Sequence, residues 1–219
     1  GIVIHDLRNP LQAISTVSHL LQSSSEPLSP SQRKWVTRIR TSVRRMDRLI
    51  RELLDFVRIR QGETLPVERQ PVSLEEVSRT AVDELQAAHP QRQLLLEARG
   101  GTCGEWDPER LMQLVGNLLS NALTHGAEAA PILVRVDGEG EQVVLEVSNQ
   151  GNPIPPELLP RIFEPFTRAS EGGNALKGVG LGLFIVHEIV AVHGGRIDVS
   201  SSAATGTTFR VRLPRTPTA

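Results

Sequence analysis

The sequence predicts two different folds in series: an α-helical hairpin of the kind that pairs into a dimeric four-helix bundle, then an α+β two-layer sandwich. Apolar side chains recur at heptad spacing in the first part, whereas the second part alternates short apolar runs with capping residues and glycine turns. The length of 219 residues fits one or two domains. A content of 39% hydrophobic and 22% charged residues is typical of a folded chain.

The second helix of the expected hairpin carries an uninterrupted heptad pattern. Its apolar residues are spaced alternately by three and four: Val36, Ile39, Val43, Met46, Ile50, Leu53 and Val57. The first helix has a similar rhythm in Ile4, Leu7, Leu11, Ile14 and Leu21. Ser29 before Pro30 suits a helix N-cap and first turn. A hairpin of this size buries too little surface to stand alone, so we expect domain 1–62 to form a homodimer.

A polar linker, residues 63–71, is expected before a second domain over residues 72–219. Ser73 and Glu76 form a capping box for a helix that runs to about residue 88. Asp107 caps the next helix, expected over 109–124, and Gly194 ends a third helix, expected over 181–193. Strands are expected at residues 94–96, 131–136, 143–147, 197–200 and 207–213.

Charge and composition exclude several classes of protein. A formal net charge of -1 argues against a nucleic-acid binder, since such proteins usually carry a basic excess. One cysteine allows neither an internal disulfide nor a multi-cysteine zinc site. The most apolar stretch, residues 183–192, is too short and too polar to cross a bilayer, so no membrane contact is expected.

The first chemical motif is His5-Asp6-Leu7-Arg8-Asn9-Pro10. A lone helical histidine is usually a surface residue, but Asp6 can hydrogen-bond this imidazole or take its proton. Asn9 lies one turn further along the same helix face as His5. Because Pro10 removes a backbone donor, the helix is weakened within a turn of the histidine. An imidazole held in this way is a competent nucleophile.

The second motif places Asn117 and Asn121 one turn apart on an expected helix that ends near His125. Asparagine is a mediocre helix former, so two in mid-helix call for a reason. Their carboxamide oxygens suit Mg²⁺ held together with substrate phosphates. Polarity of a helix surface is the alternative explanation for this pair.

Three further motifs follow in the second domain. A strand is expected to run into a turn at Asn149-Gln-Gly151-Asn-Pro153-Ile154, and two phenylalanines mark residues 161–168. Residues 165–177 lack periodicity, which is typical of a functional loop, with a plain surface loop as the alternative. The glycines of segment 178–182 open a helix and allow backbone amides to reach phosphates.

Together, in this order, the five motifs strongly resemble the transmitter of a sensor histidine kinase. The first domain resembles the HisKA-type dimerisation and phosphotransfer hairpin. The second resembles the Bergerat-type ATP-binding fold of the GHKL group. The resemblance covers nearly the whole chain and implies ATP and Mg²⁺ as cofactors. It also implies a response-regulator receiver domain as partner, an upstream sensor domain, and a location in the bacterial cytoplasm.

The resemblance implies a role for each matching residue. His5 is the phosphoacceptor, Asp6 the general base and Asn9 a residue that orients water during dephosphorylation of the partner. Asn121, with Asn117 as a second candidate, binds Mg²⁺, and Arg168 approaches the γ-phosphate. The remaining nucleotide-binding positions are His125, Asn149, Gly151, Ile154, Lys177, Gly178, Val179, Gly180, Leu181, Gly182 and Thr208.

The chain departs from the family pattern around the base. Asn149 stands where the family has an adenine-reading aspartate, and an amide oxygen accepts more weakly than a carboxylate. Pro153 replaces a glycine, and Thr124 and His125 replace a basic residue and a tyrosine. This variant of the turn resembles that of bacterial phytochrome-like kinases.

The leading hypothesis is therefore an ATP-dependent protein-histidine kinase that phosphorylates His5 and passes the phosphoryl group to an aspartate of a response regulator. The departures around Asn149 keep open a regulatory module with weak kinase activity, or a phosphatase that acts through Asn9. A GHKL ATPase or chaperone is disfavoured because the histidine hairpin would have no purpose there.

Overall fold

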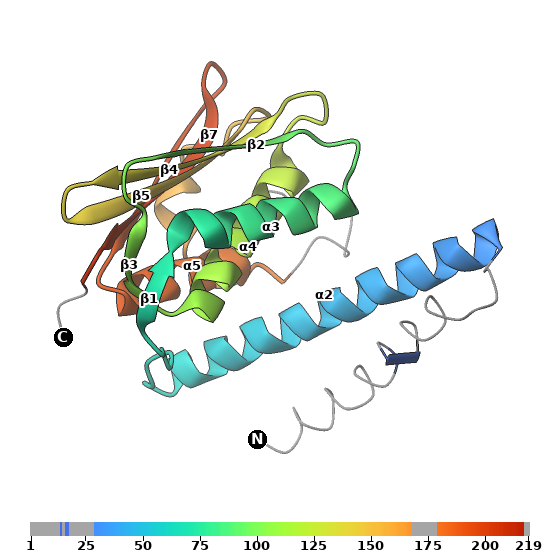
Figure 1. Ribbon diagram of the computed structural model, residues 1–219, viewed down its shortest axis with the longest axis horizontal. Helices are drawn as coiled ribbons and strands as arrows, with labels where there is room; N and C mark the ends of the chain where they lie inside the picture. Colours follow the sequence, from blue (N-terminus) through green and yellow to red (C-terminus); the bar gives the residue numbers. More distant parts are fainter. Residues whose placement is uncertain (1–13, 15, 18–28, 168–178, 217–219) are drawn as a thin grey trace. The chain divides into compact units, whose positions relative to one another are not determined.

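The computed structural model describes residues 14, 16, 17, 29–167 and 179–216, and the chain divides into two compact units, residues 1–57 and 58–219 (Figure 1). The expected first helix lies outside the described residues except at Ile14, Thr16 and Val17, which are helical. The predicted second helix is confirmed as α2, Pro30–Arg60. Ser29 caps it, because the Gln32 amide donates to Ser29 Oγ and the Ser29 amide donates to the Gln32 side chain.

The heptad positions of α2 differ in burial. Val36 and Val43 are buried, at 5% and 6% exposure. Ile39, Met46 and Leu53, which follow one another at intervals of seven, are 42%, 42% and 50% exposed. A single chain therefore leaves a continuous apolar line on α2 open.

The second unit is built on a five-stranded mixed sheet. Its strands are β2 (Leu94–Arg99), β4 (Ile132–Glu139), β5 (Gln142–Asn149), β6 (Arg196–Ser202) and β7 (Gly206–Pro214). Their order is β2-β4-β5-β7-β6, with β2 parallel to β4 and every other pair antiparallel. All five strands were expected, although several run two or three residues beyond the expected bounds.

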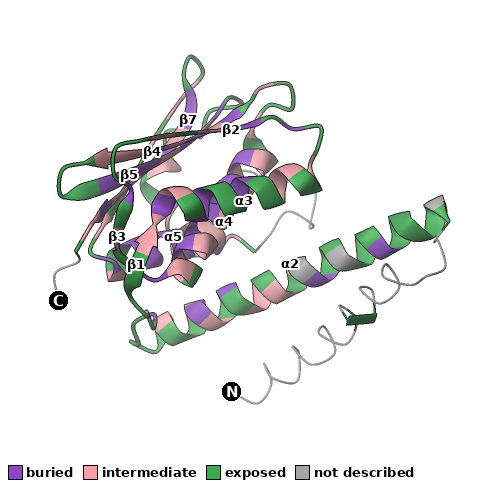
Figure 2. Ribbon diagram, viewed as in Figure 1, coloured by how far each residue is buried: buried purple, intermediate pink, exposed green. Residues whose placement is uncertain are grey.

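Helices α3 (Leu74–Ala88), α4 (Pro108–His125) and α5 (Gly182–Val192) cover one face of this sheet (Figure 1). The strands alternate, so every second side chain of β5, from Val143 to Asn149, is buried. Figure 2 shows the buried residues concentrated between the helices and the sheet. The expected caps are confirmed: Ser73 Oγ accepts from the Glu76 amide, and Asp107 Oδ1 accepts from the Arg110 amide.

A second, two-stranded sheet was not expected. Strands β1 (Gln70–Ser73) and β3 (Cys103–Trp106) pair antiparallel beside the helical layer (Figure 1). Trp106 is fully buried, and its indole Nε1 donates to the Pro214 carbonyl at 2.8 Å. Gly104 makes room for that ring, since a Cβ there would lie 2.4 Å from it. The small sheet therefore depends on long-range packing around one tryptophan.

The segment expected as a linker packs on the second unit. Leu65 is buried at 3% exposure and joins the core. The Glu68 amide donates to Asp107 Oδ2 at 2.8 Å, and Arg69 Nη2 donates to the Val192 carbonyl at 2.9 Å. These contacts hold the segment before β1 against the start of α4 and the end of α5.

The expected fold class is confirmed: a helical region followed by an α+β two-layer sandwich. Within the described ranges, none of the helices combines the length and the apolar character needed to cross a bilayer.

Candidate active site

Helix α4 supplies the two predicted asparagines. Asn117 is 7% exposed, and its Nδ2 donates to the Gly182 carbonyl at the start of α5 over 3.2 Å. This bond joins residues 65 positions apart in the sequence. It leaves Oδ1 as the remaining polar atom of the Asn117 side chain. The predicted asparagine motif and the predicted glycine segment therefore meet in the structure.

Asn121 lies one turn further along α4 and is half-buried. The described residues offer it no hydrogen bond, so its carboxamide oxygen is available to a ligand. Thr124 Oγ1, in contrast, donates to the Ser120 carbonyl of its own helix at 2.8 Å. His125 is exposed at the end of α4. The carboxamides are hard oxygen donors of the type that Mg²⁺ shares with phosphate groups.

Asn149 is the last residue of β5 and points to the helix-covered face, where it is 5% exposed. Its Nδ2 donates to the Gln150 carbonyl at 3.3 Å, which leaves Oδ1 as an acceptor. Gly151 forms an isolated bridge with Gly126 after α4. A Cβ on Gly151 would lie 2.5 Å from the His125 carbonyl oxygen, so glycine is required for this close approach. The turn after β5 is thus fixed against the end of α4.

Ile154 closes this turn by packing against the core and by donating its amide to Ser201 Oγ at 2.9 Å. Ser201 Oγ also lies 2.7 Å from Thr207 Oγ1. Thr207 is the register partner of Asn149 on β7, and both are buried on the same face of the sheet. A hydroxyl therefore lies beside the Asn149 turn, but it belongs to Thr207.

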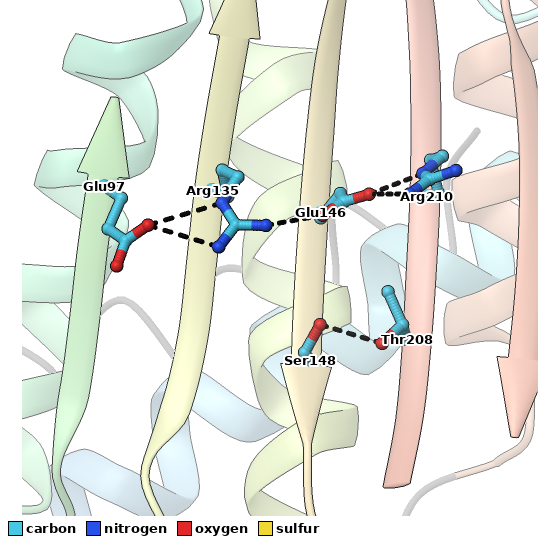
Figure 3. A network of polar contacts seen from close by, with 6 residues as sticks. All are labelled: Glu97, Arg135, Glu146, Ser148, Thr208 and Arg210. Carbon is cyan, nitrogen blue, oxygen red and sulfur yellow. Dashed lines mark hydrogen bonds and ion pairs between the residues drawn. The ribbon is translucent and has the colours of Figure 1, made fainter. Parts of the chain in front are cut away.

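Thr208 lies on the opposite face of the sheet. Its Oγ1 is 2.9 Å from Ser148 Oγ, in a row of polar side chains on the open face (Figure 3). Successive residues of a strand point to opposite faces, so a shift of one residue moves a side chain across the sheet. The structure therefore does not bring Thr208 to Asn149.

The open face is a charged surface whose groups satisfy one another. Arg135 lies between Glu97 and Glu146, with N–O distances of 3.3 and 3.4 Å, and Arg210 pairs with Glu146 on the other side (Figure 3). Arg212 pairs with Asp198 across β6 and β7. Each of these arginines forms an ion pair with at least one neighbouring carboxylate. Because such pairs at a surface contribute little free energy, this row stabilises the sheet modestly.

The glycine segment approaches the chain near Phe166. Gly180 has φ +80°, its carbonyl accepts from the Phe166 amide at 2.9 Å, and a Cβ would meet Phe166 backbone atoms at 3.0 Å. Val179 is 40% exposed, whereas Leu181 is buried at 1%. The predicted residues His5, Asp6, Asn9, Arg168, Lys177 and Gly178 lie outside the described residues.

His193 is a residue that the sequence analysis missed. It is fully buried after α5, with Nδ1 donating to the Ile189 carbonyl at 2.7 Å and Nε2 accepting from the Asp107 amide at 3.1 Å. The contact at Nε2 requires a neutral ring, because a protonated Nε2 could not accept from the Asp107 amide. Burial lowers its pKa below 6.5, with smaller opposing effects from the Ile189 hydrogen bond and nearby Asp107. His193 therefore ties the start of α4 to the end of α5. A histidine directly before a Gly-Gly cap was the available signal.

Comparisons with known proteins agree with this geometry. Residues 106–217 match the family described as histidine kinase-, DNA gyrase B- and HSP90-like ATPase, and residues 2–62 match the His Kinase A (phospho-acceptor) domain. The chain belongs to this family and has the arrangement of a histidine kinase transmitter, with a phosphoacceptor helical region before an ATPase fold.

Curated relatives match almost the whole chain. The bacteriophytochrome of Pseudomonas aeruginosa is 36% identical over 215 residues, which are 98% of this chain and 29% of that protein. The sensor histidine kinase TrcS of Mycobacterium tuberculosis is 35% identical over 96% of this chain and 42% of its own length. The chain thus spans less than half the length of these curated relatives.

Solved structures agree as well. Full-length ShkA in complex with AMPPNP superposes with a TM-score of 0.72 at 27% identity, over 99% of this chain and 45% of that one. The nucleotide-free catalytic domain of histidine kinase ThkA gives a TM-score of 0.59 at 29% identity, over 68% of this chain and 97% of that one.

Proposed function

We propose that the chain is the catalytic core of a protein-histidine kinase, which uses Mg-ATP to phosphorylate His5 and then transfers the phosphoryl group to an aspartate of a response regulator. The observation that carries this proposal is the hydrogen bond from Asn117 to the Gly182 carbonyl. It joins α4 to the glycine segment at the N-terminus of α5, where free backbone amides and the helix dipole favour phosphate groups. The match of residues 2–62 to a phosphoacceptor domain supplies the nucleophile.

At the base end, Asn149 Oδ1 accepts from the exocyclic amine of adenine, and the Gly126–Gly151 bridge holds the turn that carries it. We assign the neighbouring hydroxyl to Thr207, since Thr208 faces the other side of the sheet. At the phosphate end, the amides of residues 180–182 bind phosphate oxygens. We place Mg²⁺ on Asn121, with Asn117 as a second ligand; a bound Mg²⁺ neutralises phosphate charge.

The chemical step transfers the γ-phosphoryl group from an oxygen atom of ATP to a nitrogen atom of His5. An imidazole nitrogen of His5 forms a bond to the γ-phosphorus, while the bond from phosphorus to the β–γ bridging oxygen breaks and ADP leaves. The imidazole proton passes to Asp6. Arg168 stabilises the charge on the transferring group, and the catalysis is otherwise a matter of positioning.

We propose a homodimer through the helical hairpin. The exposed line of Ile39, Met46 and Leu53 supports it, because a second copy would cover these side chains. We also propose a sensor domain upstream of the hairpin and a cytoplasmic location, where ATP is available.

Incubation with γ-labelled ATP tests the proposal. The expected product is an acid-labile, base-stable phosphoprotein that disappears in His5→Ala. His19→Ala is the matched control, since it removes another histidine of the same segment and should keep the label. Undiminished labelling of His5→Ala would place the phosphoacceptor elsewhere.

The second candidate function is a regulatory module or a phosphatase that acts through Asn9. It is favoured by the amide at Asn149 and by Thr124, whose hydroxyl is engaged with its own helix. Calorimetry with Mg-ATP separates the two candidates, because the absence of binding at millimolar nucleotide favours the regulatory module.

A further inference from the structure

Arg92 is a buried cation with no partner for one edge of its guanidinium group. The residue lies between α3 and β2 and is 7% exposed. Its Nε and Nη2 are buried and have no hydrogen-bond partner in the described part of the chain. These two atoms form the edge with which arginine binds a carboxylate through two parallel hydrogen bonds. A buried charge without hydrogen-bond partners lowers the stability of the folded chain, so its position calls for an explanation.

The backbone fixes Arg92 in this place. Its amide donates to the His89 carbonyl at 2.9 Å, and its carbonyl accepts from Gln86 Nε2 at 2.6 Å. Gln86 Oε1 accepts from the Leu94 amide at 3.2 Å, so one glutamine of α3 holds the loop on both sides of Arg92. The guanidinium therefore enters the core from a rigid connection.

The guanidinium lies beside the base end of the candidate active site. A Cβ on Gly126 would be 3.4 Å from Arg92 Nη2 and 3.2 Å from Asn149 Cβ. The arginine and the asparagine thus flank the same glycine, the one that bridges to Gly151. The absence of a side chain on Gly126 lets the two approach each other.

We propose that Arg92 is a specificity-determining positioning residue, which makes a neutral amide the group suited to residue 149. This inference rests on the proposed ATP site and deepens it. A carboxylate at residue 149 would pair with the open edge of Arg92 and be drawn away from the adenine amine. The amide of Asn149 has no net charge, keeps its Nδ2 on the Gln150 carbonyl, and offers Oδ1 to the base. Arg92 acts on nucleotide binding through residue 149 and does not itself touch the reacting atoms.

A double-mutant cycle on the full 219-residue chain tests this coupling. The variants are Arg92→Met, Asn149→Asp and their combination, and the readouts are the melting temperature without nucleotide and the Kd for Mg-ATP. Asn149→Asp alone should raise the melting temperature, because it pairs an existing buried charge. In the Arg92→Met background, Asn149→Asp should lower the melting temperature. The melting temperatures of the variants should therefore depart from additivity by about 4 °C or more.

The nucleotide readout distinguishes positioning from a structural role. Asn149→Asp should give no gain in ATP affinity while Arg92 is present, and about a fivefold gain with Arg92→Met, where the carboxylate is released to the amine. Arg99→Met, at the exposed far end of β2, is the matched control and should combine additively with Asn149→Asp. Arg92→Gln removes the charge but keeps a polar side chain, and it serves if Arg92→Met fails to fold.

An equal effect of Asn149→Asp in both backgrounds, on melting temperature and on affinity, would overturn the coupling. A chain that binds no Mg-ATP at all would instead contradict the proposed function. In that case the melting temperatures alone still decide whether Arg92 and residue 149 are coupled.

Discussion

The two units of the molecule differ in how their apolar side chains are covered. Helix α2 keeps Ile39, Met46 and Leu53 between 42% and 50% exposed. The second unit encloses its apolar residues between three helices and a five-stranded sheet, where Leu114, Ile132 and Leu145 are fully buried. A heptad pattern stabilises a structure only when a partner covers it, whereas the sandwich completes its own core. We therefore expect substitutions in the two units to produce different kinds of failure.

The largest effect is expected from Trp106→Ala. The substitution removes a fully buried indole and leaves the Pro214 carbonyl without its donor, so it should cost about 3–5 kcal/mol of unfolding free energy. Urea unfolding followed by circular dichroism measures this loss. Trp35→Ala, at a side chain that is 60% exposed on α2, is the control with little expected change. Equal losses for both tryptophans would remove the contrast between the units.

A loss of self-association, and not of folding, is expected from Ile39→Glu. A charge on the exposed line of α2 should weaken self-association by roughly a hundredfold, because the dimer would have to bury it. Sedimentation should then show monomers, while binding of Mg-ATP to the second unit should persist. Thr37→Glu, an exposed position of the same helix outside the heptad line, should leave the dimer intact. Dimers that survive Ile39→Glu would exclude this line as the interface.

An intermediate effect is expected from pH through His193. Burial lowers the pKa of His193 below 6.5, so the unfolded chain binds a proton more readily than the folded one. The contribution of His193 to stability is complete above about pH 6.5 and is lost as the pH falls toward the folded pKa. Urea unfolding at pH 7.5 and 5.5 should show this loss in the wild type, and His193→Gln should show a smaller difference between the two pH values. His89→Gln is the control that should retain the wild-type difference.

The smallest effect is expected on the open face of the sheet. Arg210→Ala breaks an exposed pair with Glu146, which keeps Arg135 as a second partner, so the cost should be below about 1 kcal/mol and should decrease with salt. Unfolding in urea at low and high salt measures it. A larger cost would mean that the row of charges stabilises the sheet cooperatively.

The sequence predicted the parts of the fold that depend on local chemistry. Ser29, Ser73 and Asp107 cap their helices as expected, because the capping side chain and the amide it binds are three residues apart. Strands β1 and β3 were missed because they are four residues long and contain Pro71 and Gly104. Their pairing depends on Trp106, which no local pattern announces.

The candidate site was predictable to a similar extent. Asn117 and the glycine segment meet as their motifs suggested. Thr208 was expected near adenine but lies on the other face, because one position of register changes the face of a strand. His193 and Arg92 belong to none of the five motifs. Their roles follow from neighbours that lie far along the chain: Asp107 is 86 positions from His193, and Gly126 is 34 positions from Arg92.

The bond from Asn117 to Gly182 also has a consequence for folding kinetics. It closes a loop of 65 residues that contains strands β4 and β5, and the entropic cost of closing this loop is smaller once those strands have paired. We therefore expect the site to assemble late, after the sheet. During refolding, binding of a fluorescent ATP analogue should lag behind the recovery of secondary structure.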